Sequence, residues 1–249
     1  MKKIIVANWK MQLSYQASLK LAHDFVKKIS GAKGVKNEVI ICPDYLSLPA
    51  IAPILKPSRL KLGAQDSGPA ERGAYTGEVS PADLKAVGAK YVIIGHSERR
   101  DHLHENSAII KAKIVAALKN KLVPILCVGE KLTEKENGET IKFINEQLRH
   151  ALRGIKIKSA ADLIIAYEPV WAISSNKNAK PLAAGEADKI QALIKARVAR
   201  LLKKSVAVLY GGSVNAVNAA DFLRQKNIDG LLVGGVSLKI AEFKKICQL

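Results

Sequence analysis

Three short apolar stretches of the sequence each lead directly into side chains that can move protons or stabilise charge. The stretches and the polar residues that follow them are residues 163–166 with Glu168, residues 4–7 with Asn8 and Lys10, and residues 92–94 with His96 and Glu98. Side chains alternate across a strand, so we expect Asn8 and Lys10 to share one face of a sheet. The same spacing applies to His96 and Glu98. A carboxylate, an imidazole, an ammonium group and an amide then converge at one end of a sheet, which suits general acid–base catalysis.

Eight apolar runs of strand length recur along the chain and supply these positions. They are Lys3–Ala7, Glu38–Cys42, Leu60–Ala64, Tyr91–Ile94, Val123–Val128, Leu163–Tyr167, Val206–Tyr210 and Gly230–Val233. Most are continuous rather than alternating, which is typical of parallel strands buried on both faces. Apolar residues at helical spacing, such as Ile190, Ile194 and Val198, lie between them. The pattern predicts an α/β protein in which residues 1–249 form a single (β/α)8 barrel domain.

The N-terminal residues and the cysteines indicate the cellular location of the protein. Residues 1–7 begin like a secretion signal, but Asn8-Trp9-Lys10 interrupts the apolar stretch after four residues, so we expect no signal peptide and no membrane association. Cys42, Cys127 and Cys247 are widely spaced. Such cysteines are typical of buried, reduced thiols, which favours a cytoplasmic location.

The chain has a large excess of positive charge. It contains 40 Lys and Arg residues against 22 Asp and Glu residues, a formal net charge of +18. Lys27-Lys28, Lys203-Lys204 and Lys244-Lys245 stand near the ends of helix-like stretches, where cations complement the helix dipole, so solvated helix faces are the simplest explanation. Aromatic residues make up 5% of the chain and no nucleic-acid-reading motif is found, so we expect no specific nucleic acid partner. Attraction of an anionic metabolite stays open.

Two segments differ from the strand and helix patterns. Residues 65–81, rich in glycine and polar residues, are the longest stretch without a clear period, and residues 169–181 are a second unusual segment. Both follow predicted strands, and active sites of such barrels are built from the loops after the strands. Long loops in compact domains are usually functional. We therefore expect these two segments to take part in binding or closure.

Five motifs, in order along the whole chain, resemble the triosephosphate isomerase family. They are Asn8-Trp9-Lys10-Met11, Gly73-Ala74-Tyr75-Thr76-Gly77-Glu78, Gly95-His96-Ser97-Glu98-Arg99-Arg100, Tyr167-Glu168-Pro169-Val170-Trp171-Ala172-Ile173 and Tyr210-Gly211-Gly212-Ser213-Val214. The resemblance implies a TIM barrel and the interconversion of D-glyceraldehyde 3-phosphate and dihydroxyacetone phosphate through an enediolate, in glycolysis and gluconeogenesis. It implies no cofactor and no metal.

The resemblance also implies roles for the catalytic residues. Glu168 would abstract the carbon-bound proton, and His96 would polarise the carbonyl and move protons between the two oxygens. The pairing of a glutamate base with a neutral histidine is the usual description of this family itself, so both roles are taken from the family. Lys10 and Asn8 would stabilise the developing negative charge. Glu98 would be the partner of Lys10, because a lysine facing inward needs one.

Further residues are implied around the phosphate and at the subunit contact. The phosphate group would lie against Ser174, Ser213, Gly234 and Gly235, in loops after the last strands, where barrel phosphate sites commonly form. The remaining implied residues are the lid residues Pro169, Val170, Trp171, Lys177 and Ala179, the lid latch Tyr210, and Thr76. In a homodimer, Thr76 would insert into the neighbouring subunit, close to its catalytic lysine.

The sequence departs from the family pattern at three places. Residues 174–179 read Ser-Ser-Asn-Lys-Asn-Ala where the family has Gly-Thr-Gly, and Gln12 and Asp66 replace asparagines. Three hypotheses follow. An active triosephosphate isomerase agrees with the complete set of proton-transfer residues, a basic binding protein on a retired enzyme fold agrees with the charge, and another sugar-phosphate isomerase agrees with the altered lid.

Overall fold

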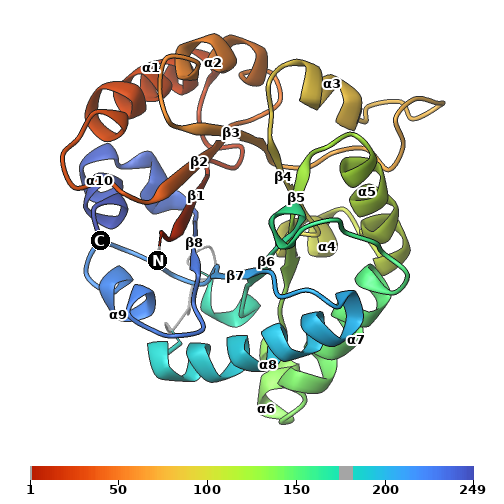
Figure 1. Cartoon of the computed structure of the whole chain (residues 1–249). Coiled ribbons are helices and arrows are strands. Elements are labelled where there is room, and N and C mark those ends of the chain that lie inside the picture. The colour runs from red at the N-terminus through yellow and green to blue at the C-terminus, as the bar shows by residue number, and fades with distance from the viewer. Residues whose placement is uncertain (1, 174–181) are drawn as a thin grey trace.

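The protein is a closed barrel of eight parallel strands, surrounded by helices (Figure 1). The computed structural model describes residues 2–173 and 182–249. Strand order follows the sequence, and β1 pairs with both β2 and β8. The strands are β1 (Ile4–Asn8), β2 (Glu38–Cys42), β3 (Lys61–Ala64), β4 (Tyr91–Ile94), β5 (Val123–Val128), β6 (Ile164–Tyr167), β7 (Ala207–Tyr210) and β8 (Gly230–Val233). The predicted (β/α)8 fold is confirmed, and each predicted run differs from its strand by at most one residue at an end.

Helices connect the strands on the outside of the barrel (Figure 1). The α-helices are α1 (Tyr15–Phe25), α2 (Leu48–Leu55), α3 (Pro81–Ala86), α4 (Ser97–His102), α5 (Ser107–Lys119), α6 (Leu132–Glu136), α7 (Thr140–Leu152), α8 (Ala184–Leu202), α9 (Ala219–Leu223) and α10 (Ile240–Cys247). Shorter helical segments are η1 (Val26–Ser30), η2 (Ala160–Asp162), η3 (Val170–Ala172) and η4 (Gly235–Leu238). Side chains fix several helix starts, as where Asn106 accepts hydrogen bonds from the amides of Ala108 and Ile109 before α5.

Both faces of the strands are buried, as the continuous apolar runs predict. Val6, Ile93 and Leu209 belong to the cluster inside the barrel, whereas Ile5 and Val208 pack outward against the helices. The closure of the barrel depends on a glycine, because a Cβ atom on Gly230 would lie 1.9 Å from the carbonyl oxygen of Ile4. The three cysteines are buried and free. Among the described helices, none has the length and apolar character needed to cross a membrane.

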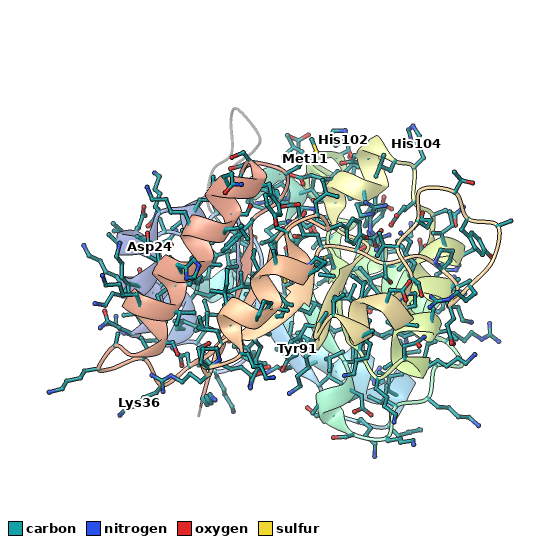
Figure 2. The ribbon with its side chains drawn as sticks, turned by 90° about the horizontal axis from the view of Figure 1, so that it is seen from above. Met11, Asp24, Lys36, Tyr91, His102 and His104 are labelled. Atoms are coloured by element: carbon teal, nitrogen blue, oxygen red, sulfur yellow. The ribbon has the colours of Figure 1, made fainter. Side chains whose placement is uncertain are left out.

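Parallel strands give the barrel two distinct ends. The carboxyl end contains the loops after the strands, and the amino end contains the connections that lead into them. Figure 2 shows Met11, His102 and His104 at the carboxyl end, and Lys36 and Tyr91 at the opposite end. The connection from β3 to α3, residues 65–80, projects from the carboxyl end beside α3 (Figure 1).

Candidate active site

Glu168 is the first residue after β6 and is almost completely buried, with 2% of its surface exposed. Its Oε1 lies 3.1 Å from Nε2 of His96, and its Oε2 accepts a hydrogen bond of 3.3 Å from the amide of Ser97. Burial raises the pKa of the carboxyl, but the charge and hydrogen bond of His96, the Ser97 amide and the charge of Lys10 together hold the pKa below its ordinary value. The carboxylate is therefore ionised and able to accept a proton.

His96 caps the N-terminus of α4 with its own ring. Its Nδ1 accepts a 3.2 Å hydrogen bond from the amide of Glu98, so in this geometry the proton of the neutral ring is on Nε2, which faces Glu168. Burial lowers the pKa of His96, but the charge and hydrogen bond of Glu168 and the charge of Glu98 together outweigh burial and raise the pKa. The amide of Glu98 opposes a positive charge on the ring, because a protonated Nδ1 could not accept the hydrogen bond of that amide. A ligand that separated the ring from Glu168 would therefore favour the neutral imidazole.

The predicted strand face for His96 and Glu98 is wrong, although both residues are in the site. β4 ends at Ile94, and Glu98 lies in the first turn of α4. Gly95 has φ of +70°, so the chain turns sharply after the strand and the alternation of side chains stops there. His96 and Glu98 come together through the helix cap instead.

Lys10 lies just after β1 and forms the predicted ion pair with Glu98. Its backbone has φ of +53°, which is uncommon for a residue with a side chain. Asn8 accepts a 3.1 Å hydrogen bond from the Lys10 amide, and Gln65 Nε2 donates to the Lys10 carbonyl oxygen at 2.8 Å. The two contacts hold the backbone of Lys10 on both sides and direct its ammonium group towards Glu98.

The predicted phosphate-binding residues lie after β7 and β8. Gly234 is beside Lys10, because a Cβ atom on it would lie 3.6 Å from Cε of the lysine, and Gly235 begins η4. Ser213 donates its amide to the carbonyl oxygen of Ala172 at 2.9 Å. That bond connects the loop after β7 with the segment that follows Glu168.

The beginning of the predicted lid packs on the loop after β5. Pro169 precedes η3, which contains Val170 and Trp171. The Val170 amide donates to the Glu130 carbonyl oxygen, and Trp171 Nε1 donates to the Glu130 carboxylate, both at 2.9 Å. Ser174, Lys177 and Ala179 lie outside the described residues.

Tyr210, the predicted latch, is fully buried and stacks on Phe222 with a centroid distance of 4.1 Å. Burial raises the pKa of its hydroxyl, and the nearby backbone of Leu182, the first described residue after the lid, opposes that effect. Gly212 is required beside it, since a Cβ atom there would lie 2.3 Å from the Tyr210 hydroxyl oxygen. Thr76 is exposed on the projecting loop 65–80.

Several residues of the site were not among the predicted ones. Glu130 receives the Trp171 indole, Gln65 holds Lys10, and the Ser97 amide binds the carboxylate of Glu168. The contact of Gly211 with the base was also not predicted, and it is close, because a Cβ atom on Gly211 would lie 2.8 Å from Glu168 Cγ. Neighbouring glycines in the sequence are a signal for close backbone approach, but they do not indicate which side chain approaches.

A second charged cluster connects the start of the projecting loop with α4 and α5. Asp66 and Lys113 are both buried, and Lys113 binds both Asp66 and Glu105. Arg99 pairs with Asp66 and with Glu105, at 2.8 Å in each case. Burial raises the pKa of Asp66 to about 6, although Lys113 and Arg99 oppose the rise. In the described parts of the chain, no group of three or more His, Cys, Asp and Glu residues is placed to hold a metal ion.

Comparison with known proteins decides the family. A family model described as triosephosphate isomerase matches residues 3–249. The chain belongs to the triosephosphate isomerase family. A triosephosphate isomerase of Caldanaerobacter subterraneus subsp. tengcongensis is 41% identical over 98% of both chains, and one of Dictyoglomus thermophilum is 42% identical over 99% of both. A third, from Dehalococcoides mccartyi, is 44% identical over 100% of this chain and 96% of its own. The resemblance inferred from the five motifs is confirmed, and with it the assignment to an isomerase of triose phosphates.

Proposed function

We propose that this chain interconverts D-glyceraldehyde 3-phosphate and dihydroxyacetone phosphate with the described residues of the carboxyl end. The observation that supports the proposal best is the position of Glu168 between His96 Nε2 and the Ser97 amide, at 3.1 and 3.3 Å. A buried base next to a ring N–H is the arrangement needed to move a proton between two adjacent carbons while an oxygen gains charge.

In the proposed reaction, Glu168 removes a proton from the substrate carbon next to the carbonyl group. The electron pair of that C–H bond forms the enediolate, and His96 Nε2–H donates a hydrogen bond to the oxygen that gains negative charge. Glu168 then returns the proton to the neighbouring carbon, while His96 moves a proton between the two oxygens. Atoms and charges balance without a cofactor or a metal ion.

Lys10, Asn8 and Glu98 complete the proposed polar set. The Lys10 ammonium group stabilises the enediolate and the phosphate, and Glu98 holds that group in place by the ion pair in the free enzyme. The Asn8 carboxamide uses its oxygen on the Lys10 amide, so its nitrogen remains for the substrate oxygen.

We assign the phosphate to backbone amides around Ser213, Gly234 and Gly235, with Ser174 from the lid. The lysine lies beside Gly234, so both recognise one anion. The lid would comprise Pro169, Val170, Trp171, Lys177 and Ala179, with Tyr210 as its latch. Closure of such a lid excludes water from the intermediate.

The same proposal covers the wider setting of the enzyme. We propose a homodimer in which Thr76 of the projecting loop contacts the site of the second copy, and a cytoplasmic role in glycolysis and gluconeogenesis. The exposure of residues 71–78 and the free state of the cysteines support these two points. We also propose that residues 1–249 form one domain.

A coupled assay with D-glyceraldehyde 3-phosphate in the presence of a chelator tests the proposed reaction. Full activity after dialysis is the expected result, because no described residue group is placed for a metal. Activity lost on dialysis and restored by a divalent ion would contradict the mechanism. Faster turnover of a longer sugar phosphate than of the triose phosphate would favour another sugar-phosphate isomerase.

Light scattering tests the proposed dimer. A mass near that of one chain would exclude the dimer.

A further inference from the structure

The amino end of the barrel contains most of the excess positive charge of the chain. The eight connections that lead into the strands are residues 2–3, 31–37, 56–60, 87–90, 120–122, 153–163, 203–206 and 224–229. Together they contain 15 Lys and Arg residues and two acidic residues, whereas the net charge of the whole chain is +18. The excess is therefore concentrated on one end and is not spread evenly over the surface.

Each of the eight connections contributes at least one exposed cation. One from each connection, in chain order, is Lys2, Lys36, Arg59, Lys90, Lys121, Lys156, Lys203 and Lys226. The barrel is closed, so its eight connections surround one axis and their cations form a ring, which we call the basic ring. Figure 2 shows Lys36 at this end, away from Met11 and His102.

The carboxylates of the connections do not neutralise the basic ring. Asp162 accepts hydrogen bonds from the amides of Lys158 and Ser159, each at 2.8 Å, and Asp229 pairs with Lys195 of α8 at 2.8 Å. Of the 15 cations, Arg224 is the one that forms an ion pair with a carboxylate of the described residues. The expectation of solvated helix faces is therefore incomplete, because Lys2, Lys36 and Lys90 precede strands.

Exposed cations that no carboxylate neutralises raise the free energy of the folded state by mutual repulsion, unless a polyanion binds them. None of the large exposed apolar residues of the described chain lies in these connections. The basic ring therefore has no side chains for stacking on bases or for insertion into a bilayer. Its exposed ammonium and guanidinium groups are suited to binding phosphate groups.

We propose that the basic ring binds the phosphate backbone of double-stranded nucleic acid without sequence preference. A duplex is favoured over an anionic lipid surface because its charge density is higher, about one charge per 1.7 Å, and counterion release then drives binding. Lysines dominate the ring, and a lysine contacts a phosphate as a point charge without reading a base. This inference goes beyond the isomerase reaction and concerns the opposite end of the molecule.

The test compares two triple variants of the full-length protein with equal net charge. The first, Lys36→Gln, Lys156→Gln and Lys226→Gln, neutralises three exposed members of the basic ring. The control, Lys20→Gln, Lys142→Gln and Lys189→Gln, neutralises three exposed lysines on α1, α7 and α8. Fluorescence anisotropy with a mixed-sequence DNA duplex, at several salt concentrations, gives affinity and salt slope for each protein. Isomerase turnover, measured in parallel, shows that each variant is folded.

In the first variant we expect at least about tenfold weaker duplex binding near 50 mM salt and a salt slope reduced by about two to three, because each phosphate contact contributes about 0.9. The control should stay within about twofold of the parent protein. Equal losses in the two variants would overturn the basic ring as the binding site. So would a parent protein that binds no duplex at 50 mM salt, or one that binds phosphatidylserine vesicles more tightly than the duplex.

Discussion

The two ends of this barrel differ in how their charged side chains are buried and paired. At the carboxyl end, Glu168 and Lys113 are buried and each has a partner of opposite charge or a ring nitrogen within hydrogen-bond distance. At the amino end, cations such as Lys36 and Lys156 are exposed and no carboxylate of the described chain pairs with them. The contribution of a buried, paired charge depends on the positions of its partners, so a small structural change there should have a large effect. The effect of exposed charges depends on how many of them there are, so the substitution of a single exposed lysine should have a small effect.

The largest expected effect is on the catalytic base. Glu168→Gln keeps the shape of the side chain but removes the proton acceptor, so turnover should fall by roughly 10²- to 10⁴-fold. Lys36→Gln at the amino end is the matched control and should leave turnover unchanged. A coupled assay at saturating substrate measures both variants. Near-native turnover in Glu168→Gln would show that the base is elsewhere.

The next effect concerns the space around that base. Gly211→Ala places a methyl group 2.8 Å from Glu168 Cγ, and a displacement of the carboxylate by about 1 Å can cost about 10²-fold in rate. A Cβ atom on Gly185 in α8 meets no atom within 4 Å, so Gly185→Ala is the control. The turnover numbers of the two variants show whether the close contact at Gly211 positions Glu168. If both variants keep the parent rate, the close contact at Gly211 does not position Glu168.

Asp66 should make stability depend on pH. Its pKa is about 6 in the folded chain against an ordinary value of 3.8, so between these values the folded protein binds a proton that the unfolded chain has lost. The contribution of Asp66 to stability therefore falls as the pH rises from about 4 to above 6. Asp66→Asn removes this pH-dependent loss of stability, so the stability of the variant relative to the parent should rise by roughly 2 kcal/mol between pH 4 and pH 7.

Urea unfolding of the parent and of Asp66→Asn, at pH 4 and at pH 7, measures this change. Lys36→Gln serves as the control and should shift stability by less than about 0.5 kcal/mol at either pH. A constant difference between the parent and Asp66→Asn at the two pH values would show that Asp66 does not titrate in this window.

The smallest expected effect is on substrate capture. The sequence alone leaves open that the excess charge attracts the anionic substrate, but most of the charge is at the amino end, a strand length of roughly 15 Å or more from the site. Screening limits the field to about 8 Å at physiological salt. We therefore expect kcat/KM to change by less than about threefold between 50 and 200 mM salt. A fall of tenfold or more would show that the distant charge steers the substrate.

The sequence predicted the fold well because the strands are buried on both faces, and continuous runs such as Val123–Val128 reveal such strands directly. It also placed Glu168, His96 and Lys10 at one end, since parallel strands all terminate there. It did not predict contacts made by backbone groups, such as the Ser97 amide on Glu168 or the His96 ring on the α4 terminus. Those contacts depend on the turn at Gly95, where strand alternation ends. The basic ring was also missed, because its residues are scattered in sequence and meet only in the closed barrel.

The left-handed backbone of Lys10 has a consequence for the stability of the protein. A residue with a side chain at φ of +53° costs of the order of 1 kcal/mol, and Asn8 and Gln65 keep it there. Glycine accepts the same angles without that cost, but Lys10→Gly would also remove the ion pair with Glu98 and the ammonium group from the site. Part of the folding free energy of the barrel is therefore used to hold one cation at the place where the reaction needs it.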